Sequence, residues 1–139
     1  MSKYSIIHRD HTSDIYAESD VPGEFRRFTN GLGSEQLSIT LIQIPPYSDF
    51  EQGTGHSHAE IEELYIIVKG TLTMRFDEDI VKVSEGSVVR VSPNVVRSHR
   101  NEGDEPVEMW AISCKIDYDD SKLIREFWSP SDKAAQKKQ

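Results

Sequence analysis

The sequence is divided into short apolar or alternating runs, and almost none reaches the length of about ten residues that an ordinary helix requires. The segments between the runs carry Gly, Pro, Asn and Asp, which tolerate or impose turn geometry. Eight short strands at this spacing predict an all-β sandwich or barrel. The expected strands are residues 25–29, 37–44, 64–68, 71–76, 80–83, 87–91, 96–99 and 107–114.

Two of these expected strands differ in how their apolar residues are arranged. In residues 71–76, the side chains of Leu72, Met74 and Phe76 alternate with polar ones, which indicates a strand with one buried face. Residues 64–68 are apolar on both faces. A strand of this kind is covered on both sides, either by a second layer of its own chain or by a partner subunit.

One short helix is expected near the C-terminus, at residues 121–128, with Asp120 or Ser121 as its N-cap and Pro130 shortly after its end. Its apolar residues form a stripe that we interpret as packing surface. This stripe and the doubly apolar strand offer more apolar surface than one thin sandwich buries, which predicts a homodimer. The stripe consists of Leu123, Ile124, Phe127 and Trp128.

A chain of 139 residues has room for one domain. The expected organisation is an N-terminal extension (1–24), a β-barrel (25–116), a segment with the C-terminal helix (117–130) and a disordered tail (131–139). The only cysteine, Cys114, excludes an internal disulfide and is interpreted as a small buried hydrophobe in a terminal strand.

The charge balance and the apolar runs exclude several classes of partner. Sixteen Lys and Arg against 24 Asp and Glu give a net charge of -8, so nucleic acid and anionic membrane surfaces are not expected partners. No apolar run approaches the roughly 20 residues of a membrane helix. Because no apolar run follows Met1, we read no secretory signal and expect a cytoplasmic protein.

The segment most informative about chemistry contains two histidines, His56 and His58, followed by a carboxylate at Glu62 or Glu63. Residues two apart on an extended chain project from the same face, so both imidazoles point the same way. The carboxylate follows where the chain enters its most apolar strand. Two neutral imidazoles and one carboxylate form the facial set that holds a divalent first-row metal and leaves positions open.

This segment resembles the first motif of the cupin superfamily, which is His-X-His, three or four residues, Glu, six residues and Gly. Here His56, His58, Glu63 and Gly70 occupy those positions. The glycine that precedes the motif in the family is replaced by Phe50. The resemblance extends over about residues 25–116. It implies a small single-domain cupin, a double-stranded β-helix or jelly-roll barrel with the site inside it.

The second cupin motif is matched only at its ends. Gly86 and Asn101 fit the pattern, whereas Ser92 and Asn94 replace its Pro and Gly. Arg97 stands where the family has its fourth ligand, a histidine. A guanidinium does not lose its proton and so cannot take the place of that imidazole.

Two interpretations of Arg97 remain open. In the first, His56, His58 and Glu63 hold the metal and Arg97 clamps the carboxylate or phosphate of an anionic substrate. In the second, Arg97 pairs with Glu63 and the ion pair replaces the metal. His99 lies two residues further along the same strand face, and a bulge after Pro93 could bring it into the coordination sphere as a fourth ligand.

The leading hypothesis is a cupin that binds one divalent transition metal (Fe, Mn, Zn or Ni) and a small, anionic organic molecule. The resemblance admits a metal-dependent isomerase or dioxygenase-type enzyme, with Arg97 fixing the substrate charge and Tyr65 or His99 as proton donor. The alternative is a metal-poor, non-enzymatic ligand-binding or sensor module with a Glu63–Arg97 ion pair.

Overall fold

The computed structural model describes residues 2–128 of the chain. Ten strands follow one another along this part of the sequence, preceded or interrupted by two single helical turns, η1 (Arg9–His11) and α1 (Thr29–Leu32). The strands are β1 (Glu24–Arg27), β2 (Leu37–Ile44), β3 (Gly55–His58), β4 (Glu63–Lys69), β5 (Leu72–Phe76), β6 (Asp79–Val83), β7 (Val88–Val91), β8 (Arg97–Arg100), β9 (Val107–Cys114) and β10 (Ser121–Ile124).

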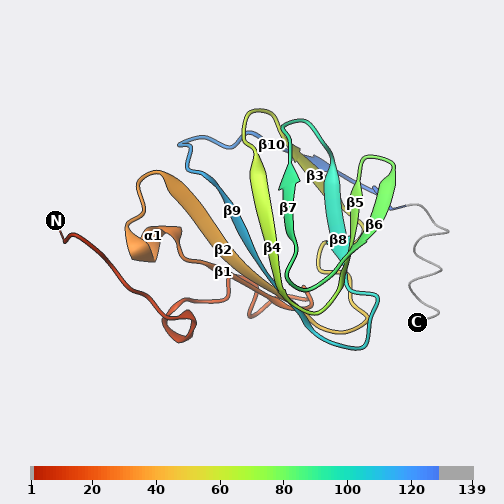
Figure 1. The fold of residues 1–139 in the computed structure, drawn as a ribbon, viewed down its shortest axis with the longest axis horizontal. Coiled ribbons are helices and arrows are strands. Elements are labelled where there is room, and N and C mark those ends of the chain that lie inside the picture. The colour runs from red at the N-terminus through yellow and green to blue at the C-terminus, as the bar shows by residue number, and fades with distance from the viewer. Residues whose placement is uncertain (1, 129–139) are drawn as a thin grey trace.

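Within residues 2–128 these strands form two antiparallel sheets of five strands each (Figure 1). One sheet has the order β1-β2-β9-β4-β7 and the other the order β10-β3-β8-β5-β6. All eight strands expected from the sequence are present, and the predicted all-β architecture is confirmed. β3 and β10 were not predicted, because four-residue strands of mixed polarity give no recognisable periodicity.

The apolar core lies between the two sheets. Ile44 of β2, Ile67 of β4 and Met109 of β9 extend from the first sheet and are fully buried. Leu72 and Met74 of β5 meet them from the second sheet and are fully buried as well. These two positions are buried as the alternation predicted, but Thr73 between them is only 4% exposed, so this part of β5 is buried on both faces rather than on one.

The expected C-terminal helix at residues 121–128 is wrong. Residues 121–124 form β10, which pairs antiparallel with the edge of β3 and places Ser121 opposite His58. Glu126 has a positive φ of 53°, which a right-handed helix does not contain. The free edge of β3 supplies strand partners for residues 121–124, and Phe127 N–H donates to the carbonyl oxygen of Gly53, so these bonds replace the helical ones that the apolar spacing suggested.

The apolar residues of that segment do not form one stripe. Leu123 is 57% exposed, whereas Trp128 is buried on the outer face of the second sheet. There the indole Nε1 donates to Ser98 Oγ at 2.9 Å, and the Arg100 guanidinium lies 4.1 Å from the ring centroid. The predicted disordered tail, 131–139, lies outside the described residues.

On the outer face of the first sheet, one expectation about buried surface is wrong and another stays a prediction. Cys114 is exposed rather than buried, because the register of β9 turns it outward opposite Leu37. In β4, Tyr65 and Ile67 are buried as expected, but Val68 on the other face is 41% exposed. This single chain therefore covers only one face of β4 completely, and the homodimer remains a prediction. No helix within residues 2–128 is long and apolar enough to cross a membrane.

Candidate metal centre and ligand cavity

The two histidines and the glutamate of the first motif converge inside the barrel. β3 carries His56 and His58 on one face, and Glu63 begins β4 in the facing sheet. One donor atom from each of the three residues lies within 4.8 Å of the other two. Glu63 Oε1 is 4.0 Å from Nε2 of each histidine.

These separations are somewhat longer than those between ligands of one ion. Adjacent ligands at about 2.0–2.1 Å from a tetrahedral ion lie roughly 3.4 Å apart. Both histidine–glutamate separations are 4.0 Å, so small side-chain movements would bring these donors onto one ion. The donor types are also those that divalent first-row metals accept, and three protein ligands leave coordination positions for a substrate or water.

Asp120, just before β10, fixes the orientation of His58. Its Oδ1 lies 2.7 Å from His58 Nδ1, so the other ring nitrogen, Nε2, faces Glu63. Its Oδ2 accepts hydrogen bonds from the backbone N–H groups of Glu60 and Ile61. Burial by itself would raise the pKa of the Asp120 carboxyl, but these bonds and the one with His58 outweigh it and lower the pKa to about 2.

Glu51, in the loop before β3, contacts the two other histidines of the site. Its Oε1 is 2.6 Å from His99 Nδ1, and its Oε2 is 3.5 Å from His56 Nδ1. Burial favours a higher pKa for this carboxyl, but the charge of His99 and the hydrogen bonds from His56 and His99 lower it to about 2. Glu51 is therefore a buried anion that orients both imidazoles.

His99 does not belong to the cluster of converging donors within residues 2–128. Its Nδ1 is engaged by Glu51, its ring stacks on Phe50 at a centroid distance of 5.9 Å, and its side chain is 6% exposed. The remaining nitrogen, Nε2, is buried and has no hydrogen-bond partner in the described part of the chain. Its role as a fourth metal ligand remains a prediction.

Arg97 is buried beneath the cluster, with a side chain that is 1% exposed. Its Nη1 donates to the carbonyl oxygen of Val95 at 2.9 Å, and its Nη2 lies 3.7 Å from Glu63 Oε1. The guanidinium does not line the cavity next to the cluster. This position brings Arg97 to Glu63, as the ion-pair interpretation requires, and leaves the role of substrate clamp untested.

Tyr65 follows Glu63 on the inner face of β4 and is buried. Its hydroxyl donates a hydrogen bond to Glu63 Oε1. Burial, and next the negative charge of Glu63, raise the pKa of the Tyr65 hydroxyl well above its usual value. The phenol therefore keeps its proton, and its role as a catalytic proton donor remains a prediction.

A cavity of about 630 Å³ opens beside the cluster, between the two sheets. His56, His58 and Glu63 form part of its wall, and Glu51, Tyr65 and His99 contribute as well. Its size lies within the range of small-molecule sites. The converging donors thus face a space large enough for an organic ligand.

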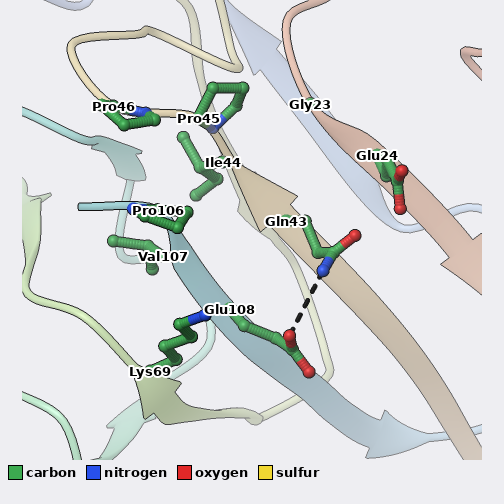
Figure 2. A pocket seen from close by; sticks show the side chains of 10 residues that line it. All are labelled: Gly23, Glu24, Gln43, Ile44, Pro45, Pro46, Lys69, Pro106, Val107 and Glu108. Atoms are coloured by element: carbon green, nitrogen blue, oxygen red, sulfur yellow. Dashed lines mark hydrogen bonds between the residues drawn. The ribbon is translucent and has the colours of Figure 1, made fainter. Parts of the chain in front are cut away.

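A second hollow, of about 440 Å³, lies elsewhere on the first sheet and contains none of these residues (Figure 2). Pro45, Pro46 and Pro106 form much of its wall. Its two acidic side chains already have partners: Glu108 accepts hydrogen bonds from Gln43 and Arg9, and Glu24 accepts one from Arg26. No cluster of candidate metal ligands among the described residues lies there.

Sequence reasoning missed Glu51 and Asp120. Glu51 precedes His56 by five residues in a loop, and no local pattern marks it. Asp120 was considered only as a helix cap, and it lies 62 residues from the histidine that it contacts. Their importance follows from tertiary contacts, and only Glu51, through its place five residues before His56, gave a weak signal in the sequence.

The chain is therefore a two-sheet β-barrel protein with a candidate ligand site between its sheets. The sequence pattern of the Cupin domain family matches residues 41–113, and the chain belongs to that family. A comparison with curated proteins finds no match.

Solved structures agree with this fold at low sequence identity. A structure titled as a putative sugar phosphate isomerase from Acidithiobacillus ferrooxidans is 20% identical, with a TM-score of 0.64 over 76% of this chain and 72% of that one. The polyketide cyclase RemF from Streptomyces resistomycificus is 12% identical, with a TM-score of 0.67 over 92% and 89%. Oxalate decarboxylase from Lactobacillus farciminis is 17% identical, with a TM-score of 0.67 over 84% of this chain and 34% of that chain. These likenesses show the shared fold.

Proposed function

We propose that this cupin binds one divalent transition metal through His56, His58 and Glu63, and a small anionic organic molecule in the adjoining cavity. The observation that carries the proposal is the convergence of the three donors inside the barrel. The contact between Asp120 and His58 supports it, because metal-bound histidines characteristically give their other ring nitrogen to a carboxylate. Fe, Mn, Zn and Ni all accept this donor set.

We further propose an enzymatic role of the isomerase or dioxygenase type for the same site. A bound metal would supply Lewis acidity or a position for dioxygen. The chain's own groups fix the geometry of the site. Asp120 and Glu51 orient the imidazoles, and the Tyr65 hydroxyl donates a hydrogen bond to Glu63. The buried and unpartnered Nε2 of His99 is a further group available for proton transfer.

Metal analysis tests the proposal directly. Protein stripped with EDTA and titrated with Zn²⁺ or Mn²⁺ in a calorimeter is expected to bind close to one equivalent. His56→Ala should abolish stoichiometric binding, since two remaining donors hold a metal poorly. His11→Ala is the matched control, because His11 is exposed and lies outside the cluster. Wild-type protein that takes up less than about a tenth of an equivalent would contradict the proposal.

The second candidate function is a metal-poor ligand-binding or sensor module. It is favoured by one observation, the distance of 3.7 Å between Arg97 Nη2 and Glu63 Oε1. A buried guanidinium beside the Glu63 carboxylate competes with a metal cation for the negative charge of that carboxylate. Under this function Arg97→Met strengthens metal binding, whereas under the substrate-clamp role it weakens binding of an anionic ligand and leaves metal content unchanged.

We also propose that the chain forms a homodimer through the outer face of the first sheet. Val68 and Val88 on this face are 41% and 62% exposed, and Leu37 is 55% exposed. Large exposed apolar patches on soluble proteins often mark interaction sites, which supports a partner for this face. Light scattering at micromolar concentration should give twice the chain mass of 15.9 kDa, and a monomer would refute the proposal.

A further inference from the structure

The cavity beside the metal cluster has an arginine at its other side, on β1. In the register of the first sheet, Arg27 lies opposite Thr40, Thr40 opposite Ala111, and Ala111 opposite Tyr65. Residues that are directly opposite in an antiparallel sheet share a face, so these side chains form one row across the inner face. Arg27 and Tyr65 both line the cavity.

The Arg27 guanidinium is available for a ligand. Within the described range 2–128 it makes no hydrogen bond or ion pair. Its Cζ atom lies over the ring of Phe25 in a cation–π contact, 5.4 Å from the centroid. Phe25 stacks on Phe50 at 6.0 Å, and Phe50 stacks on His99 at 5.9 Å. A row of planar groups therefore runs from Arg27 to His99 along one wall and holds the arginine over the cavity.

The neighbouring part of the inner face carries hydroxyl groups. Ser38, Thr40 and Ser113 line the cavity, and their hydroxyls have no partner among residues 2–128. Ser113 is also the strand partner of Glu63, so its hydroxyl group is the one nearest to the metal cluster along this row of residues. Unpaired hydroxyls in a cavity wall are suited to a ligand that has hydroxyl or carbonyl oxygens of its own.

We infer that Arg27 binds the oxyanion end, carboxylate or phosphate, of a small polyhydroxylated molecule whose other end reaches His56, His58 and Glu63. This inference rests on the proposed function, because it assigns the ligand of the same cavity. In this inference Arg27 rather than Arg97 binds the anion, because Arg97 is buried behind Glu63 whereas Arg27 lines the cavity. A guanidinium fits either oxyanion with two parallel hydrogen bonds.

The spacing of the strands limits the size of this ligand. β1 and β4 are separated by three strand intervals, which is about 14 Å between the backbones of Arg27 and Tyr65. A bare phosphate ion cannot span this distance even with the arginine extended toward it. A chain of several carbon atoms with an anionic end can contact both the arginine and the histidine cluster.

The test is a calorimetric titration with ribose 5-phosphate, gluconate, ribose and inorganic phosphate, each in EDTA and again with one equivalent of Mn²⁺. Ribose 5-phosphate or gluconate is expected to bind more tightly than ribose and phosphate, and whichever binds identifies the preferred oxyanion. Arg27→Met should weaken this binding about tenfold or more, as the loss of a charge-assisted hydrogen bond does. Thr40→Val should weaken it about threefold, since it removes one neutral hydroxyl.

Arg90→Met is the matched control. Arg90 lies on β7 and pairs with Glu62 on the exterior, so this variant loses the same charge outside the cavity and should bind within twofold of wild type. The inference is overturned if neither anionic probe binds, if ribose binds equally well, or if Arg27→Met binds like wild type. Anion binding that depends on Arg27 in protein that takes up no Mn²⁺ would refute the metal site and retain the anion subsite. Metal uptake together with anion binding that Arg27→Met does not weaken would retain the metal site and refute the anion subsite.

Discussion

The interior of the barrel has two halves with opposite character, although the same strands build both. β4 begins in one half with Glu63 and Tyr65, which face the histidines, and continues into the other with Ile67, which is fully buried among Met74 and Met109. One half is closed by apolar packing, and the other keeps a cavity of about 630 Å³. The closed half supplies folding free energy, so that the open half can retain buried charges and unpaired polar atoms.

The largest expected effect comes from truncating the closed half. Ile67→Ala should lower the free energy of unfolding by about 2–5 kcal/mol, because the side chain is fully buried and leaves a cavity behind. Urea denaturation followed by circular dichroism measures this change. Affinity for Zn²⁺ in the folded variant should stay within about threefold of wild type, and a much larger loss would show that the two halves are not separable.

The turn at the end of β4 gives the next largest effect. Gly70 has a φ of 81°, and an added Cβ would lie 2.6 Å from the carbonyl oxygen of Pro106. Gly70→Ala should therefore destabilise the fold by about 2 kcal/mol or more, since both backbone strain and a backbone clash oppose the side chain.

Gly86 provides the matched control for this glycine. Its φ is 89°, but nothing lies within 4 Å of an added Cβ. Gly86→Ala should show the conformational cost alone, about 1–2 kcal/mol. Equal losses in the two variants would show that the contact with Pro106 contributes nothing.

In the open half, the expected effect is on metal binding rather than on folding. Asp120→Asn should lower the affinity for Zn²⁺ about tenfold to a hundredfold, because the neutral amide orients His58 less strongly and makes it a weaker donor. The neighbouring Asp119→Asn is the control, since the hydrogen bonds of Asp119 within residues 2–128 go to Ser121 and none goes to His58. An Asp120→Asn variant with wild-type affinity would remove Asp120 from the site.

The smallest effect is expected outside both halves. Cys114 is exposed on the outer face of the first sheet. Cys114→Ser should change the free energy of unfolding by no more than about 0.5 kcal/mol, as exposed substitutions usually do. A loss above about 1 kcal/mol would indicate that this face is covered in solution, as a homodimer through the first sheet would require.

The comparison of the two halves also shows which parts of the structure local sequence could predict. The alternation along β5 predicted the burial of Leu72 and Met74, but not the burial of Thr73 on its other face. The segment that forms β10 was expected to be helical because its apolar spacing suits a helix, but it pairs with the edge of β3 instead. The same contact brings Asp120 to His58, so the error in secondary structure concealed a residue of the site.

The sequence by itself indicated the all-β architecture and placed His56 and His58 on one strand face, and the resemblance to the first cupin motif selected Glu63 over Glu62 as the third donor. Side-chain alternation along a strand is a local property, and so are the two-residue spacing of His56 and His58 and the place of Glu63 at the start of an apolar strand. Only the tertiary structure decided which charges meet these donors. Glu51, Arg97 and Asp120 come from three different loops and strands, and their distances to the histidines and Glu63 depend on how the two sheets pack. Electrostatic interactions between residues far apart in the chain depend on such distances, and no local pattern encodes them.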